Sequence, residues 1–391
     1  MTNAKKICFY TLSVLLPAAS CKETYVSPYI LPETGYLVIE GSVNNGHDTT
    51  TLVLSRTTPL NNDNLQYELG ATVTIEGKDN SVYALPEKTS GHYSISQLNL
   101  NTAVEYRLHI STGAGREYVS DFVSIRNNPP IDSISWKLEK DGVQLYMNTH
   151  DPQNNSRFYQ WEYTETWQFR SAFGSTIKYF IIPGSPGGNF YSVGFRNQSD
   201  YDSAHQILMC WRTNLSSNLV LGSTEKLNND VVFLPLTFIP PGAQRLSILY
   251  SIDVKQHTWT KAGYDFLQRM KKNTEATGSV FDAQPSELNG NLRCISNPDE
   301  PVIGYFNISF LQEKRIFISR SDLTDWNYNS GCVQIELDNK SDVIAANGQG
   351  LMPTTPAKLD PFGGIISFYV SEPICVDCTL TGSRKKPSFW P

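Results

Sequence analysis

Short runs of alternating apolar and polar residues fill most of this chain, and they limit its fold more than any other feature does. Turn residues interrupt these runs about every 8 to 15 positions, as expected for a protein built of strands. In residues 105–110 (EYRLHI) the two kinds of side chain alternate strictly, which predicts one buried face and one solvated face. The 20 Tyr, 18 Phe and 7 Trp also favour strands. We therefore predict a mainly β fold.

The length of 391 residues is enough for two domains with proper cores. Residues 33–128 contain about seven or eight strand patterns, which predicts one immunoglobulin-like β-sandwich. The sequence NNPP at residues 127–130 predicts the boundary. Residues 129–391 predict a larger β-rich domain, similar to a fibronectin type III sandwich with long insertions. This domain should carry one amphipathic helix at about residues 260–273, with Thr260 as its N-cap.

The most aromatic segment of the second region is residues 157–169. Its Tyr159, Trp161, Tyr163 and Trp167 have the same parity and therefore share one face of a regular strand. We expect this face to form a sandwich core, and a platform that stacks on sugars is the alternative. The alternating run at residues 246–254 is the expected pairing partner.

The N-terminus predicts export and lipidation. Residues 1–20 contain two lysines and then a short apolar stretch, as in a signal peptide. They end in PAAS before Cys21, which is similar to a bacterial lipobox, so Cys21 is the predicted lipidation site. An ordinary signal peptide with an incidental Cys21 is the alternative. Residues 21–32 read as a tether. No later stretch is apolar for about 18 residues, so the lipid is the only predicted anchor.

Five cysteines remain beyond Cys21, and all of them lie in the second region. In an exported protein such clustering predicts disulfides that join long loops. We expect the Cys375/Cys378 tail to bond to Cys332, and Cys210 to bond to Cys294, although spacing alone does not fix the pairing. Metal binding and reactive thiols are weaker alternatives for the C-x-x-C pair.

No catalytic motif stands out in the sequence. It lacks H-E-x-x-H, G-x-S-x-G and phosphate-binding loop patterns. Glu162 and Glu165 should point to opposite faces of a strand, and Asp151 before Pro152 more often begins a turn than serves catalysis. We predict no catalytic residues, no metal and no cofactor. The net charge of −6, with no basic run, also argues against nucleic acid as a partner.

A series of short motifs runs through the chain in a fixed order. They are YLVIEG at 36–41, LSRT at 54–57, PPIDSI at 129–134, THDP at 149–152, WEYTETW at 161–167, YSI at 250–252, GSVFD at 278–282, and the tail from Cys375 to PSFW at 387–390. Together they resemble the DUF4249 family of Bacteroidota lipoproteins. This resemblance implies a cell-envelope location, frequent genetic neighbourhood with TonB-dependent outer-membrane receptors and no catalytic residues. The charged Lys22 and Glu23 after Cys21 resemble signals that carry such lipoproteins to the outer surface of the outer membrane, and a solvated tether is the alternative.

The leading functional hypothesis is a non-enzymatic outer-membrane lipoprotein that captures ligand for, or docks on, a TonB-dependent transporter. An envelope adhesion or scaffold module is the first alternative. A secreted hydrolase is the second, and a pocket that holds a Ser–His pair or facing carboxylates would favour it. Docking or ligand contacts are expected in the insertion between residues 170 and 230, unless its aromatic residues fold back on the sheet. These aromatic residues are Tyr179, Phe180, Phe190 and Tyr191.

The first testable prediction concerns Cys21. Its replacement by Ser should release the processed protein from the membrane, because the acyl chains are the only predicted apolar anchor. Fractionation of cells that express the two forms measures this. A processed Cys21→Ser protein that stays with the membrane after a high-salt wash contradicts the lipid anchor.

Overall fold

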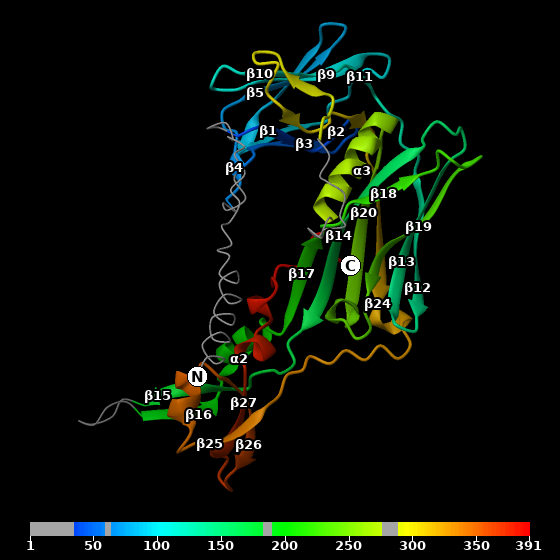
Figure 1. Ribbon diagram of the computed structural model, residues 1–391. Coiled ribbons are helices and arrows are strands. Elements are labelled where there is room, and N and C mark those ends of the chain that lie inside the picture. Colours follow the sequence, from blue (N-terminus) through cyan, green and yellow to red (C-terminus); the bar gives the residue numbers. More distant parts are fainter. Residues whose placement is uncertain (1–34, 59–63, 183–189, 276–287) are drawn as a thin grey trace, which may run out of the picture.

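The computed structural model describes residues 35–58, 64–182, 190–275 and 288–391, which form a mainly β protein (Figure 1). The fold class predicted from the sequence is confirmed. Figure 1 shows three parts: a sandwich at the top, a larger one in the middle and a small group of strands at the bottom. The predicted signal peptide, tether and lipidated Cys21 lie outside the described residues.

The first sandwich consists of two six-stranded sheets that enclose one core. Strand β9 (Glu105–Ser111) shows how the alternating sequence forms this core, because its Tyr106, Leu108 and Ile110 are fully buried and their neighbours are not. One sheet contains β22 (Val302–Ile303), β1 (Leu37–Glu40), β3 (Thr49–Arg56), β8 (His92–Ser96), β7 (Glu87–Thr89) and β4 (Gln66–Tyr67). The other contains β21 (Leu292–Cys294), β10 (Glu117–Ser120), β9 (Glu105–Ser111), β5 (Thr72–Gly77), β6 (Val82–Leu85) and β11 (Val123–Ser124).

The chain returns to this first sandwich late in the sequence. β22 pairs in parallel with β1, β21 pairs antiparallel with β10, and β23 (Ile308–Ser309) pairs in parallel with β2 (Val43–Asn44). The first sandwich therefore also contains strands from beyond the predicted boundary at residues 127–130. Strands of two or three residues are too short to show which sheet they join, so the sequence pattern could not reveal this return.

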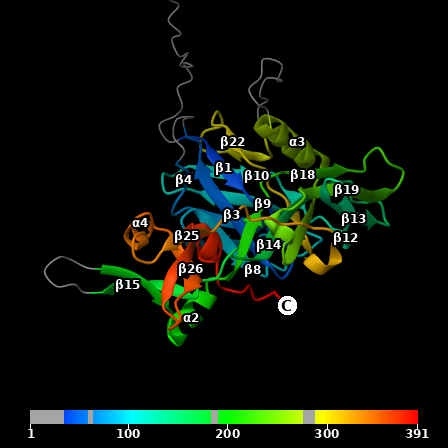
Figure 2. The same cartoon turned by 90° about the horizontal axis from the view of Figure 1, so that it is seen from below.

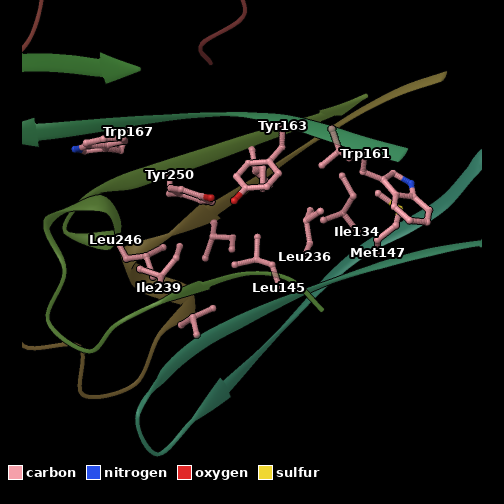
Figure 3. Close-up of a cluster of buried hydrophobic side chains, with 14 of the residues drawn as sticks. Ile134, Leu145, Met147, Trp161, Tyr163, Trp167, Leu236, Ile239, Leu246 and Tyr250 are labelled. Atoms are coloured by element: carbon pink, nitrogen blue, oxygen red, sulfur yellow. The ribbon is translucent and has the colours of Figure 1, made fainter. Parts of the chain in front are cut away.

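The second sandwich packs a five-stranded sheet on a three-stranded sheet. Figure 3 shows Trp161, Tyr163 and Tyr250 facing Leu145 and Leu236 across its core. The larger sheet contains β17 (Met209–Leu215), β14 (Phe158–Arg170), β20 (Leu249–Thr258), β24 (Gln312–Ser319) and β18 (Val220–Ser223). The smaller sheet contains β12 (Ile131–Glu139), β13 (Gly142–Asp151) and β19 (Asp230–Ile239).

The aromatic strand is a core strand, as predicted. Its four aromatic residues of equal parity are at most 7% exposed, which rules out a sugar-stacking platform on that face. The predicted pairing is also confirmed, because β14 lies antiparallel to β20 with Trp167 opposite Tyr250. The Trp161 indole donates a hydrogen bond of 2.9 Å to Gln256 Oε1, so its polar atom is satisfied inside the core.

Helix α3 (Lys261–Glu275) confirms the predicted amphipathic helix. The Gly263 N–H donates to Thr260 Oγ1 at 3.1 Å, which is the predicted N-cap contact. Its Phe266 and Leu267 are buried against Trp259. The chain also forms shorter helices that were not predicted, because segments of three to eight residues are too short to show a helical period. These are α2 (Gln198–His205), α4 (Val343–Gly348), α5 (Pro373–Val376) and the 3₁₀ turns η2 (Gln244–Leu246), η3 (Arg320–Asp322) and η4 (Cys378–Leu380).

A third part, which we call the distal lobe, was not predicted. It has its own small core of Ile177, Val193, Phe368 and Val370, to which α4 contributes Val343. Two of its strands come from the predicted insertion and three from the C-terminal region, so the lobe is formed by two segments that are far apart in the chain. Its strands are β15 (Ile177–Ile182), β16 (Phe190–Phe195), β25 (Ile335–Asp338), β26 (Met352–Leu359) and β27 (Ile365–Ser371).

Two disulfides fix the C-terminal segment to the rest of the molecule. Cys332 bonds to Cys375, as predicted, and Cys210 bonds to Cys378. The predicted link between Cys210 and Cys294 is wrong. Cys294 lies on β21 in the first sandwich, while Cys210 lies on β17 in the second. Since Cys375 and Cys378 bond to different partners, they form neither a redox pair nor a zinc site.

The second testable prediction follows from this arrangement. Alkylation of the exported protein without reductant should label no thiol among these five cysteines in the native state, because Cys294 is buried at 2% exposure. After unfolding without reductant, mass mapping should find label on Cys294 alone. Label on Cys210, Cys332, Cys375 or Cys378 would contradict the two bridges.

Candidate ligand-binding cavity

A cavity of about 270 Å³ lies where the two sandwiches meet, and we call it the junction cavity. Strand β1 and the residues after it form one wall, and β14 forms another. Helix α3 and the returning segment (residues 292–309) complete it, and Figure 2 shows α3 and β22 on the same side of the molecule. The main lining side chains are Val38, Glu40, Ser42, Gln160, Glu162, Trp259, Phe266, Leu267, Met270, Ile303 and Tyr305.

Side chains alternate between the two faces of a strand, and this alternation determines which of them line the cavity. On β1, Leu37 and Ile39 are buried in the first sandwich, so Val38 and Glu40 face away from that core. On β14, Gln160 and Glu162 have the opposite parity to the core aromatic residues. Each sandwich therefore presents the outer face of one strand to the cavity.

A glycine allows the returning segment to form the wall. Gly304 has φ +148°, and a Cβ atom there would come within 2.6 Å of the Ile39 carbonyl oxygen. Only glycine permits this close approach of two backbones without a shift. The next residue, Tyr305, belongs to the aromatic part of the wall. Its ring centroid lies 6.0 Å from that of Trp259 and 5.8 Å from that of Phe266.

The charged groups of the cavity wall are all acidic. Glu40 and Glu162 line it, and no Lys, Arg or His is among its lining residues. Glu162 Oε1 accepts a hydrogen bond of 3.1 Å from Gln160 Nε2. Within the described residues neither carboxylate forms an ion pair, and Lys255, directly opposite Glu162 in the sheet, instead lies 3.9 Å from Glu313.

A serine and a histidine from different sandwiches meet beside the cavity. Ser42 Oγ lies 3.1 Å from His257 Nδ1. Burial lowers the pKa of His257, against the opposing effect of the Glu162 charge. The ring is therefore neutral at pH 7, and its Nδ1 can accept the Ser42 hydroxyl proton. A second hollow, bordered by Ser216, Lys271 and Thr274, shares Glu162 and Met270 with the cavity.

The aromatic residues predicted as a docking surface lie elsewhere, in the distal lobe. Tyr179 donates to the Leu351 carbonyl at 2.9 Å, and burial raises its pKa to about 12. Tyr191 packs on the same core, while Phe180 is 37% exposed with the Lys178 ammonium 4.9 Å from its ring centroid. The backbone of Phe190 belongs to β16. Tyr179 and Tyr191 thus fold back on the sheet, and a docking role for this hairpin stays a prediction.

Two other sequence interpretations concern carboxylates. Asp151 accepts backbone hydrogen bonds from Gln153, Asn155 and Ser156, which confirms that it begins a turn. Glu165 faces the core side of β14, where Arg245 donates to both of its oxygens, whereas Glu162 lines the cavity. The two glutamates therefore point to opposite faces, as predicted.

The junction cavity could not be predicted from the sequence, because its walls come from four segments that are far apart in the chain. The one local indication of this cavity is Glu162, which alternates with the buried aromatic residues of β14 and therefore points away from the core. In the described part of the chain, no three His, Cys, Asp or Glu side chains are grouped so that they could hold a metal ion. No helix in that part is long and apolar enough to cross a membrane.

These features define a mainly β protein of two sandwiches and a disulfide-linked distal lobe, with a cavity between the sandwiches. The chain belongs to the DUF4249 family, described as a domain of unknown function, whose model matches residues 23–315. The match covers both sandwiches through the first half of β24. It ends before β25 to β27, which form much of the distal lobe. A comparison with curated proteins finds no match.

Proposed function

We propose that this protein is a lipid-anchored envelope protein that captures a small ligand in the junction cavity and passes it to a TonB-dependent transporter. The observation that carries the proposal is the cavity itself. Small-molecule sites are concave, mostly apolar and often located between domains, with a few polar groups that orient the ligand. The junction cavity has these properties, with Glu40, Glu162 and Gln160 as its polar groups.

The predicted lipid on Cys21 supports the location, and the family resemblance supports the transporter as receiver. Docking on a barrel needs a contact of at least about 1,000 Å². The β15–β16 hairpin offers exposed apolar side chains for it, since Phe180, Ile181 and Phe195 are 37%, 60% and 51% exposed. The ligand cavity and the docking surface are then formed by different residues.

The third testable prediction uses a blocked cavity. Met270 is only partly buried and lines the cavity, so Met270→Trp should fill it with an indole ring. Lipidated protein is purified from its native membrane in mild detergent, and bound small molecules are identified by mass spectrometry. We expect one molecule at near-stoichiometric amount in the wild type and at least about tenfold less in Met270→Trp.

The matched control is Lys272→Trp, which places the same ring on the exposed side of α3 and should keep the ligand. Equal ligand in Met270→Trp, or none in the wild type, would contradict capture in this cavity. The same preparation tests the transporter. Near-stoichiometric recovery of a TonB-dependent receptor supports the partnership, and ligand-loaded protein without a receptor refutes it.

A second candidate function is ester hydrolysis, which the Ser42–His257 contact favours. Ser42 Oγ would attack the ester carbonyl while His257 Nδ1 takes its proton. The proton would then leave with the alcohol, and water would release the acid from the acyl-serine. The constellation is incomplete, because within the described residues no carboxylate is hydrogen-bonded to His257 to orient it, as a catalytic triad requires.

The fourth testable prediction separates these two functions. A fluorophosphonate probe labels an activated serine covalently, so a hydrolase would show label on Ser42 that Ser42→Ala removes. The control Ser217→Ala changes an exposed serine of the neighbouring hollow and should leave labelling unchanged. Ligand capture alone predicts no covalent label on any of the three proteins, and this is the result we expect.

A further inference from the structure

We propose that the junction cavity selects a small organic cation, with an ammonium group on an apolar body of about one aromatic ring. This inference rests on the proposed capture function and names the ligand class. It follows from the charge of the cavity walls, the aromatic rings between them and the absence of a cation among the lining residues.

The charges of the cavity wall favour a cation. Glu40 belongs to the first sandwich and Glu162 to the second, and both carboxylates line one cavity. Two other carboxylates on the sheet of Glu162 have basic partners, since Asp253 pairs with Arg315 and Glu165 pairs with Arg245. Both side chains of the cavity pair are exposed, so these two carboxylates lie at the open side of the cavity, where their field attracts a ligand cation. The same field repels an anionic ligand.

One wall of the cavity is aromatic and consists of Trp259, Phe266 and Tyr305. Elsewhere in this protein, aromatic faces are covered by the chain's own cations, as Phe122 is by Lys78 and Arg107. Among the described residues, no Lys or Arg lies over a ring of this wall. Aromatic faces next to carboxylates are the usual surroundings of a bound ammonium group. Trp259 and Phe266 are each 4% exposed and pack against Tyr305, so the partly exposed Tyr305 ring is the aromatic face that an ammonium group can reach.

The size and shape of the cavity suit a small ligand. Val38, Leu267, Met270 and Ile303 form the apolar part of the lining, and the volume of about 270 Å³ suits a compact ligand. The flexible thioether of Met270 can adapt to its outline. Since Met270 and Glu162 also border the neighbouring hollow, a longer body can extend there.

The fifth testable prediction compares three probes with the same ring and chain length. Phenethylamine is a cation at neutral pH, 2-phenylethanol is neutral and phenylacetate is an anion. Calorimetry with the full mature chain should show phenethylamine binding about tenfold more tightly than the alcohol, with no measurable binding of phenylacetate. Glu40→Gln and Glu162→Gln should each weaken phenethylamine at least about fivefold and leave the alcohol unchanged.

The control variant is Glu139→Gln, which removes an equal charge from an exposed position at the end of β12 and should change nothing. Equal binding of the amine and the alcohol, or no effect of the two cavity substitutions, would overturn the cation preference and leave capture intact. A native ligand without positive charge would do the same. Loss of all probe binding together with no co-purified ligand would instead overturn the capture function.

Discussion

The return of residues 292–309 to the first sandwich is the constraint on which the other features depend. Backbone pairing places Val302 beside Leu37 and Ile308 beside Val43. Between these two contacts the chain has to run along the outside of β1, and Gly304 allows it to do so against Ile39. The cavity wall formed by Ile303 and Tyr305 is a consequence of this path.

Buried polar contacts hold the returning segment in place. Glu300, just before β22, accepts a 2.6 Å hydrogen bond from the Tyr118 hydroxyl and pairs with Arg116 at 2.8 Å and with Arg56 at 3.5 Å. A buried ion pair adds little net stability, but breaking it leaves a charge without a partner, so it favours one arrangement. On the other side, Asn307 donates to the Thr258 carbonyl at 3.0 Å, which connects the segment to β20.

The parts that could be predicted are those with a local periodic signal. The parity of Tyr159, Trp161 and Tyr163 identified a core strand, and Thr260 marked the start of α3. The return could not be predicted, because Val302 and Leu37 are far apart in the chain and β22 has two residues. The junction cavity and the bond between Cys210 and Cys378 also join segments that are far apart in the chain, so neither could be predicted from local patterns. Local patterns show that a segment is a strand, while long-range contacts decide which sheet it joins.

The cavity, its acidic walls and its aromatic rings are thus products of one topological feature, and the proposed capture of a cation depends on it. Native-state hydrogen exchange at low denaturant tests this feature most directly. The account predicts that residues 292–309 open together with β1 and β3 as one cooperative unit, distinct from β20 and β24. Exchange of 292–309 together with β20 and β24, or much faster than β1, would contradict it.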